Sequence, residues 1–304
     1  MSVADVLAAH GLPAADLGER PASAKRFPDG AAYRVEIPST EGPRCLEAIL
    51  DEAARLAVPI HRVSQGSGVD LLARSELEEF ASLGREHGVE ISLFARPNAA
   101  WGRSASARAP AGGVLAPVAW GMDQVTQQLA EIRRAADFGF RSVLIADIGV
   151  LRLFSALRAS GDLPPDMQAK VSVMLPAANP ASAQVLEELG ANTINVPVDL
   201  SVAQLAAIRA AIDVPLDVYV EAPDNLGGIV RMHEIAEIVR VAGPVHVKFG
   251  LRNAPDLYPS GTHLEATAVA LSRERVRRAR IGLDRLADFP TSPVPAPVAA
   301  LVAG

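Results

Sequence analysis

Charged residues interrupt several short apolar segments that otherwise have the composition of buried strands. Glu36, Glu221 and Lys248 each lie at or near the carboxyl end of such a segment. A lysine whose pKa is lowered by burial or by a neighbouring cation can act as a base or a nucleophile. We therefore take Lys248 as the candidate catalytic amine, with Glu221 and Glu36 as its acid–base partners. The alternative is an ammonium group that only pairs with Glu221.

Arginine and glycine residues near the same segment ends suit the recognition of an anion. A guanidinium group matches the geometry of a carboxylate or a phosphate. Backbone N–H groups at a glycine turn before a helix can also receive an anion. A double glycine equally serves as an ordinary turn, so both interpretations stay open. The candidate substrate-binding residues are Arg62, Arg96, Asn98, Arg252, Asn253, Gly227 and Gly228.

A divalent metal ion is an alternative role for the carboxylates. Glu36, Asp147 and Glu221 could together bind a hard cation such as Mg²⁺. The sequence contains neither the HxH nor the HExxH pattern of histidine-ligated metals. Cys45 is the only cysteine, which excludes a cysteine-ligated iron–sulfur cluster and intrachain disulfides. The sequence indicates no other cofactor.

Short segments rich in β-branched residues alternate with helical patterns from residue 33 onward. The predicted strands are 33–38, 59–64, 90–96, 142–147, 170–175, 193–197, 216–221 and 245–250. The predicted helices are 42–56, 74–87, 122–137, 149–160, 180–189, 201–211, 228–241 and 263–286. Strict alternation predicts a parallel sheet, and eight such units are typical of a TIM-type (β/α)8 barrel of the α/β class. A doubly wound open sheet is the alternative, although IPSTEGP lacks the glycine-rich turn usual after its first strand.

Polar residues at every second position of these segments predict a polar barrel interior, because side chains alternate between the faces of a strand. Buried charges must form ion pairs, bind a ligand, or both. The carboxyl ends of the strands form the catalytic face of (β/α)8 enzymes, so we place the site there. The residues that share a face are Arg34 with Glu36, Asp217 with Tyr219 and Glu221, and His246 with Lys248.

The remaining segments give the domain organisation. We expect residues 1–31 to form a helix and a loop, 32–286 a single barrel domain, and 287–304 a Pro/Ala-rich flexible tail. The segment 99–121 follows the third predicted strand and is too long for an ordinary connection. Loops of this length are usually lids, binding loops or disordered.

Charge and hydropathy limit the classes of partner. A formal net charge of -6 argues against a nucleic-acid binder, which usually has a basic surplus. No apolar run approaches the roughly 20 residues that a membrane span needs. The N-terminus lacks the pattern of a signal peptide. We expect a cytoplasmic protein with a small-molecule anionic substrate and no nucleic-acid or membrane partner. A homo-oligomer is compatible with apolar barrel helices, but no interface signal is present.

Two segments carry a family resemblance. FGFRSVLIADIGVLRLF and VSVMLPAANPASAQVLEELGANTINVPVDLSVAQLAAI are similar to the corresponding runs of peptidase family U32. The resemblance implies a barrel-like fold and, at VYVEAPDNLGG, a role for Glu221 as the counterpart of a signature glutamate. The clustered cysteines of that signature are absent, so the iron–sulfur-dependent activity of some members is not expected here.

Together these patterns predict a barrel enzyme that acts on a small carboxylate or phosphate by acid–base chemistry. A lyase or aldolase that uses Lys248 and a metal-assisted hydrolase, peptidase-like chemistry included, remain alternatives. The third alternative is a non-catalytic barrel that binds a small molecule.

Overall fold

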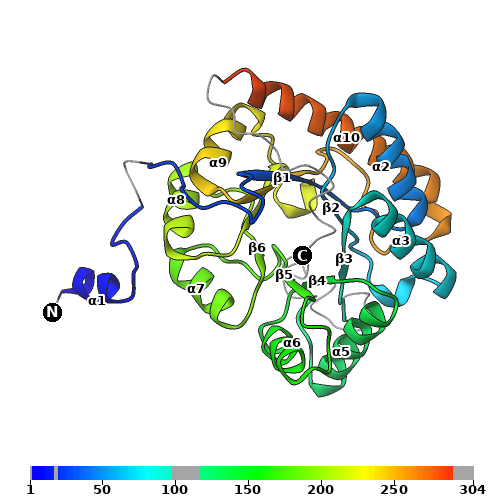
Figure 1. The fold of residues 1–304 in the computed structure, drawn as a ribbon, viewed down its shortest axis with the longest axis horizontal. Helices are drawn as coiled ribbons and strands as arrows, with labels where there is room; N and C mark the ends of the chain where they lie inside the picture. The colour runs from blue at the N-terminus through cyan, green and yellow to red at the C-terminus, as the bar shows by residue number, and fades with distance from the viewer. Residues whose placement is uncertain (1, 17–19, 98–116, 290–304) are drawn as a thin grey trace.

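Eight parallel strands close into a barrel in the computed structural model, which describes residues 2–16, 20–97 and 117–289. Each strand pairs with its neighbours in sequence, and β8 closes the ring against β1. Figure 1 shows the helices arranged around this ring. This order confirms the (β/α)8 prediction and makes the open-sheet alternative wrong. The strands are β1 (Tyr33–Pro38), β2 (Arg62–Ser64), β3 (Glu90–Phe94), β4 (Ser142–Ile145), β5 (Gln168–Val171), β6 (Thr193–Asn195), β7 (Leu216–Glu221) and β8 (Val245–Phe249).

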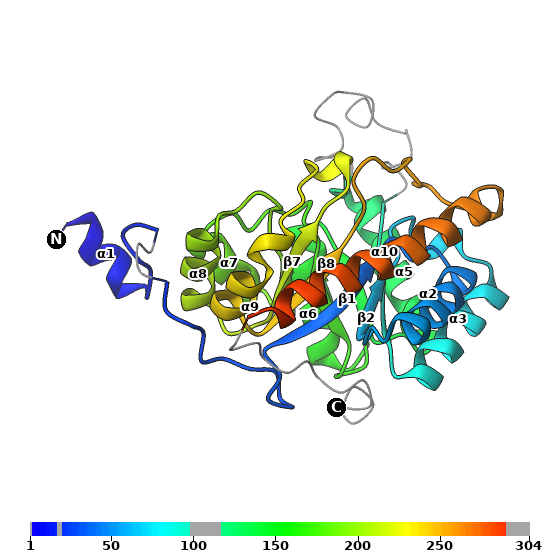
Figure 2. The same cartoon turned by 90° about the horizontal axis from the view of Figure 1, so that it is seen from above.

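Helices surround the barrel and follow the predicted order along the chain. They are α2 (Pro43–Leu56), α3 (Arg74–His87), α5 (Met122–Asp137), α6 (Ile148–Ser160), α7 (Pro180–Glu188), α8 (Val202–Ala211), α9 (Ile235–Ala242) and α10 (Glu265–Ala287). A further helix, α1 (Val3–Ala9), lies to one side of the barrel and buries none of its residues (Figure 2). The described residues also include the 3-10 turns η1 (Val69–Leu71), η4 (Asp224–Leu226), η5 (Met232–Glu234) and η6 (Thr262–Leu264).

Alternation along the strands separates two environments. The apolar residues Val35, Val247 and Phe249 are fully buried against the surrounding helices. Gly282 lets α10 approach β8 closely, because a Cβ at this position would lie 2.4 Å from the ring of Phe249. The helix layer thus covers the outer face of the barrel, and the polar residues of the same strands face inward.

The helix predicted at 228–241 begins later than expected. Gly228 has a φ of +61°, and Val230 forms an antiparallel bridge with Glu221. This geometry keeps the chain extended after β7, so the regular helix α9 starts only at Ile235. Six predicted strands are also shorter in the structure, because their ends belong to the connecting loops: 59–64, 90–96, 142–147, 170–175, 193–197 and 245–250.

Parts of the remaining predictions fall outside the described residues. These parts are Asn98, most of the 99–121 segment, and 290–304 of the predicted tail. Within the described ranges, none of the helices combines the length and the hydropathy needed to cross a membrane.

Candidate functional site

A network of buried ion pairs fills the barrel interior. Its two sets of formal charges are equal and opposite, and its members come from β1, β2, β3, β5, β7 and β8. Such balance offsets much of the cost of removing charges from water. The network joins the carboxylates of Glu36, Glu90 and Asp217 to the cations of Arg62, Lys170 and Lys248.

Glu36 is the centre of this network. Its Oε2 lies 2.5 Å from Nζ of Lys170, and its Oε1 lies 3.2 Å from Nζ of Lys248. The hydroxyl of Ser64 donates to Oε1 at 2.9 Å. Burial would raise the pKa of Glu36, but the attraction of Lys170 and Lys248 outweighs it and lowers the pKa to about 2. The carboxylate is therefore ionised at neutral pH.

Asp217 anchors the other side of the network. It lies 2.6 Å from Nζ of Lys170 and 3.2 Å from Nη1 of Arg62, and it accepts the hydroxyl proton of Thr193 at 2.7 Å. Arg62 also pairs with Glu90 at 2.9 Å. Burial raises the pKa of Asp217, but Lys170 and Arg62 more than reverse this effect and hold the pKa well below its usual range. These contacts fix Lys170 and Arg62 in place inside the barrel.

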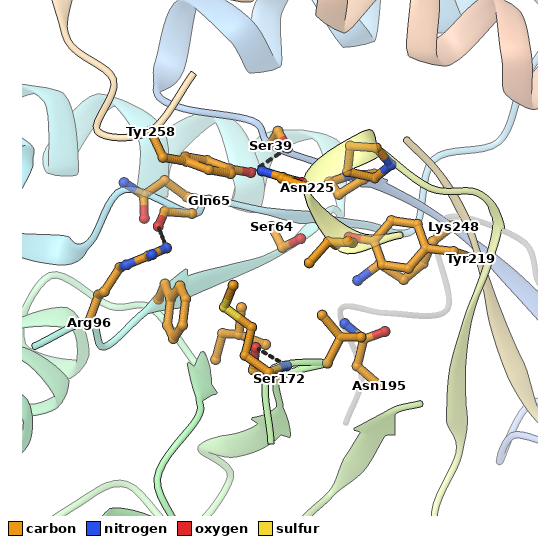
Figure 3. Close-up of a pocket in the computed structure, with 18 of the residues that line it drawn as sticks. Ser39, Ser64, Gln65, Arg96, Ser172, Asn195, Tyr219, Asn225, Lys248 and Tyr258 are labelled. Carbon is orange, nitrogen blue, oxygen red and sulfur yellow. Dashed lines mark hydrogen bonds between the residues drawn. The ribbon is translucent and has the colours of Figure 1, made fainter. Parts of the chain in front are cut away.

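A cavity of about 430 Å³ lies at the carboxyl ends of the strands, next to this network (Figure 3). This volume suits a small molecule. Apolar side chains such as Phe94, Leu144 and Met174 form part of its wall. The polar residues of its wall include Ser39, Ser64, Gln65, Ser172, Asn195 and Asn225, together with the cations Arg96 and Lys248.

Lys248 presents its ammonium group to the cavity. Nζ lies 4.3 Å from the centre of the Tyr219 ring, a cation–π contact, in addition to its contact with Glu36. With its amide oriented to satisfy its neighbours, Asn195 accepts a hydrogen bond from Nζ at 2.9 Å and donates to the carbonyl of Asp217 at 3.2 Å. The side chain is only 2% exposed, so these neighbours hold Nζ in place.

Arg96 lies on the opposite side of the cavity from Lys248 (Figure 3). Its Nη1 donates to the carbonyl of Gly66 at 3.3 Å, and its guanidinium carbon lies 5.2 Å from the centre of the Phe94 ring. Burial lowers the pKa of Arg96, although Tyr258 opposes that effect. The group stays charged, because arginine titrates far above neutral pH. The cavity thus has a positive group at each side.

Tyr258 forms part of the cavity wall and ties two loops together. Its hydroxyl lies 2.5 Å from Oγ of Ser39, which follows β1. Its ring packs on Gly66, which follows β2, so closely that a Cβ there would lie 2.4 Å from the ring. The buried carboxylate of Glu41 accepts the N–H groups of Gly66 at 2.9 Å and Ser67 at 3.1 Å. These contacts make this wall a single packed unit.

Of the three predicted catalytic residues, the structure brings Lys248 and Glu36 together and places Glu221 elsewhere. The register between β7 and β8 shifts between Tyr219 and Glu221, which ends the simple alternation assumed from the sequence. Oε1 of Glu221 accepts the N–H of Arg252 at 3.0 Å, and Oε2 lies 3.6 Å from Arg278 of α10. The predicted position of Glu221 at the cavity is therefore wrong.

The predicted anion-binding arginines occupy three different environments. Arg96 lines the cavity, as expected. Arg62 does not reach the mouth, because its guanidinium group is fixed in the interior network by Glu90 and Asp217. Arg252 lies outside the cavity lining, where its half-exposed side chain pairs with Asp224 at 2.6 Å. The prediction that Arg62 and Arg252 lie at the anion-binding mouth is therefore wrong.

The backbone N–H groups of Gly227 and Gly228 form hydrogen bonds within their own turn. The N–H of Gly227 donates to the carbonyl of Asp224, and that of Gly228 donates to the carbonyl of Pro223, both at 3.1 Å. Asn253 donates its own N–H to the carboxylate of Asp224 at 2.5 Å. The predicted anion site at Gly227 and Gly228 is wrong, because these N–H groups already have acceptors and stabilise the turn.

The structure does not bring the three predicted metal ligands together. Asp147 is the N-cap of α6, where it accepts the N–H of Val150 at 2.9 Å and that of Ala119 at 3.0 Å. Glu36 lies inside the barrel, and Glu221 faces α10. Within the ranges 2–16, 20–97 and 117–289, no cluster of three or more His, Cys, Asp or Glu side chains is placed to hold a metal ion.

Sequence reasoning did not assign a role to Lys170 or Tyr258. Lys170 stands at the start of the predicted strand 170–175, where a charged residue is usually exposed. The structure starts β5 earlier, at Gln168, and this buries Lys170 completely. The sequence feature that could have predicted this burial is a lysine directly beside a run of apolar residues. Tyr258 lies in a loop, and only the tertiary fold shows that it reaches Ser39.

The sequence profile of peptidase family U32 matches residues 118–222, which span α5 to the end of β7. Among solved structures, the U32 peptidase Mk0906 aligns with 18% identity and a TM-score of 0.41, over 66% of this chain and 73% of that chain. The chain resembles peptidase family U32. The U32 match ends just past Glu221, so it includes neither Glu36 nor Lys248. No curated protein sequence matches the chain.

Other barrels share the fold without close sequence similarity. A Coccidioides immitis protein assigned as a fructose-1,6-biphosphate aldolase aligns with 15% identity and a TM-score of 0.50, over 86% of this chain and 92% of that chain. A copper homeostasis protein CutC from Streptococcus agalactiae aligns with 12% identity and a TM-score of 0.46, over 71% of this chain and 98% of that chain. At 15% identity the likeness to the first of these shows the barrel fold alone. The chain is thus a U32-like (β/α)8 barrel.

Proposed function

We propose that this barrel is an enzyme that acts on a small carboxylate or phosphate, with Lys248 as the reacting amine and Arg96 as the ligand of the anionic group. The observation that supports this proposal is the placement of Nζ of Lys248. It lies 3.2 Å from a buried carboxylate oxygen and borders a cavity that has a guanidinium group on its other side. A carbonyl compound with an anionic group could therefore meet both residues at once.

The chemistry available to Lys248 is that of a lysine held beside a carboxylate. A neutral amine attacks a carbonyl carbon and releases water to give an imine, whose protonated form withdraws electrons from the adjacent carbon. That withdrawal helps to break a neighbouring C–C or C–H bond, which is lyase or aldolase chemistry. Glu36, with its pKa lowered to about 2, is a weak base, so it positions Nζ, and the proton of the ammonium group must pass to the substrate or to water. Lys248 could instead exchange a proton with the substrate without a covalent step.

The hydrolase alternative has less support from the site. Asp147 and Glu221, which were expected to help bind a metal ion, lie outside the cavity lining. The amine of Lys248, by contrast, is already at the cavity. We therefore favour a lyase over a hydrolase.

Borohydride trapping tests the proposal directly. The full chain is incubated with pyruvate or with dihydroxyacetone phosphate, and sodium borohydride then reduces any imine to a stable secondary amine. We expect an adduct in the natural chain and in the Lys25→Met control, whose lysine pairs with Asp213 outside the barrel. We expect none in Lys248→Met. An adduct that persists in Lys248→Met contradicts the proposal.

Thermal shift with the same compounds separates binding from chemistry. A ligand that binds only the folded chain raises the melting temperature, whether or not it reacts. Stabilisation without an adduct, and without turnover of the ligand, would favour the non-catalytic binding barrel and contradict the assignment of Lys248 as a nucleophile.

A further inference from the structure

Two of the three lysines in the chain share one buried carboxylate. Lys170 lies 2.5 Å from Oε2 of Glu36, and Lys248 lies 3.2 Å from Oε1 of the same group. The third, Lys25, pairs with Asp213 outside the barrel. All remaining residues of the Lys and Arg type are arginines. Arginine keeps its charge near neutral pH, whereas a buried lysine can lose its proton. The two lysines are thus the titratable cations of the interior network.

Their surroundings divide their roles. Lys248 lines the cavity, whereas Lys170 does not and is fully buried. Lys170 is fixed by two carboxylates, since it also lies 2.6 Å from Asp217. A substrate in the cavity can touch Lys248, but Lys170 can act on it only through Glu36.

The charged groups that face Lys170 come from four strands. They are Glu36 of β1, Arg62 of β2, Asp217 of β7 and Lys248 of β8. Burial lowers the pKa of Lys170 to about 8, although Asp217 and Glu36 oppose that shift. Lys170 therefore carries its positive charge at neutral pH and loses it in a range in which an exposed lysine stays protonated.

We propose that Lys170 is a positioning residue that weakens the hold of Glu36 on the ammonium form of Lys248. The inference rests on the proposed function, in which Lys248 reacts as a neutral amine. Lys170 neutralises part of the charge of Glu36 and adds a like charge near Lys248. Both effects disfavour the protonated form of Lys248. Without Lys170, Glu36 would pair with Lys248 alone and hold its proton more firmly.

Competitive acetylation measures this effect without a substrate. Trace acetic anhydride acylates only unprotonated amines, so the extent of labelling at Lys248 over a pH series gives its pKa after peptide mass spectrometry. In Lys170→Met we expect the labelling of Lys248 at pH 7, where Lys170 is charged in the natural chain, to fall by about tenfold, with a corresponding rise of the midpoint. Lys170→Arg keeps the cation and should leave the midpoint close to that of the natural chain. Lys25→Met is the matched control and should not move it.

The Lys170→Met chain leaves Glu36 and Asp217 with one cation fewer and could fail to fold. The double variant Lys170→Met/Asp217→Asn removes one charge of each sign, and it carries the same expectation. Folding of each variant is checked by circular dichroism. An unchanged midpoint at Lys248 in a folded variant without Lys170 would overturn the inference.

The experiments distinguish a failure of the proposed function from a failure of the positioning role of Lys170. If the natural chain traps no pyruvate but the Lys248 midpoint rises without Lys170, the imine chemistry is wrong and the positioning role stands. If trapping succeeds at Lys248 but the midpoint does not move, the proposed function stands and Lys170 has only a structural role.

Discussion

At the scale of single residues, the site depends on two cations that face one cavity from opposite sides. Lys248 has an anion, an amide oxygen and an aromatic face as neighbours. Arg96 has a carbonyl and an aromatic ring as neighbours. Under the proposed function the first group reacts with the substrate, and the second holds its anionic end.

Replacement of Arg96 should weaken the binding of anions. We expect Arg96→Met to bind inorganic phosphate and pyruvate about ten to a hundred times more weakly, because a hydrogen bond to a charged group contributes about 1.5–3 kcal/mol. Isothermal titration calorimetry measures the affinity. Arg252→Met is the matched control, because that arginine lies outside the cavity lining. Equal affinities for the Arg96→Met and natural chains would remove Arg96 from the site.

Residue types alone predicted part of this site. A lysine and a glutamate near strand ends indicated the Lys248–Glu36 pair, and the structure places them together. The position of Glu221 could not be predicted, because one irregularity in β7 turns its side chain outward. Arg62 was expected at the mouth of the barrel, and its depth along the barrel axis could not be predicted from the sequence.

At the scale of elements, the loops after β1, β2 and β8 build one wall of the cavity. Tyr258 of the last loop contacts Ser39 of the first and packs on Gly66 of the second. The carboxylate of Glu41 holds the second loop through backbone N–H groups. The shape of the cavity therefore depends on contacts between loops far apart in the sequence.

A methyl group at position 66 should disturb this wall. The Cβ of Gly66→Ala would lie 2.4 Å from the ring of Tyr258, so the ring must move. Overpacking of this kind typically costs about 1–3 kcal/mol, and we expect that loss in the free energy of unfolding from urea titration. Gly42→Ala is the control, because its Cβ would meet Leu72 at an ordinary 3.9 Å.

A double variant isolates the cause of that loss. In a Tyr258→Ala background the ring is absent, so Gly66→Ala should cost little further stability. If Gly66→Ala destabilises the chain equally with and without the ring, the contact between these residues is not the reason.

The arrangement of elements was the most predictable feature of the chain. Alternation of strand and helix patterns was sufficient for the fold, because each unit shows a period of two or of 3.6 residues. The late start of α9 was not predictable from periodicity. It depends on the positive φ of Gly228 and on the pairing of Val230 with Glu221, which arise from the tertiary fold.

At the scale of the whole molecule, the interior network links six of the eight strands by ion pairs. Removal of one partner from a buried pair leaves an uncompensated charge, which typically costs about 3–5 kcal/mol. We expect a loss of this size in the free energy of unfolding for Asp217→Ala. Asp213→Ala removes an exposed partner and should change stability by no more than about 1 kcal/mol. Equal losses in the two variants would contradict a structural role for the network.

The network should also make stability sensitive to acid. Burial, reinforced by Arg62, lowers the pKa of His246 from 6.5 to about 4. Between these values the unfolded chain binds more protons than the folded chain, so stability that is present above pH 6.5 is lost as the pH falls toward 4. The contribution amounts to about 3 kcal/mol.

Urea unfolding at a series of pH values tests this expectation. In His246→Gln the free energy of unfolding should fall less steeply between about pH 6.5 and about pH 4 than in the natural chain. The exposed His87 provides the control variant His87→Gln, which should keep the natural slope. Parallel curves for all three chains would show that His246 does not cause the loss.

The central claim is that Lys248 is the reacting amine of an anion-binding cavity. A crystal structure of the chain after treatment with pyruvate and borohydride tests it most directly. The account predicts density continuous with Nζ of Lys248 and a carboxylate within hydrogen-bond distance of Arg96. A reduced adduct on Lys170 or Lys25, or a ligand bound away from this cavity, would contradict it.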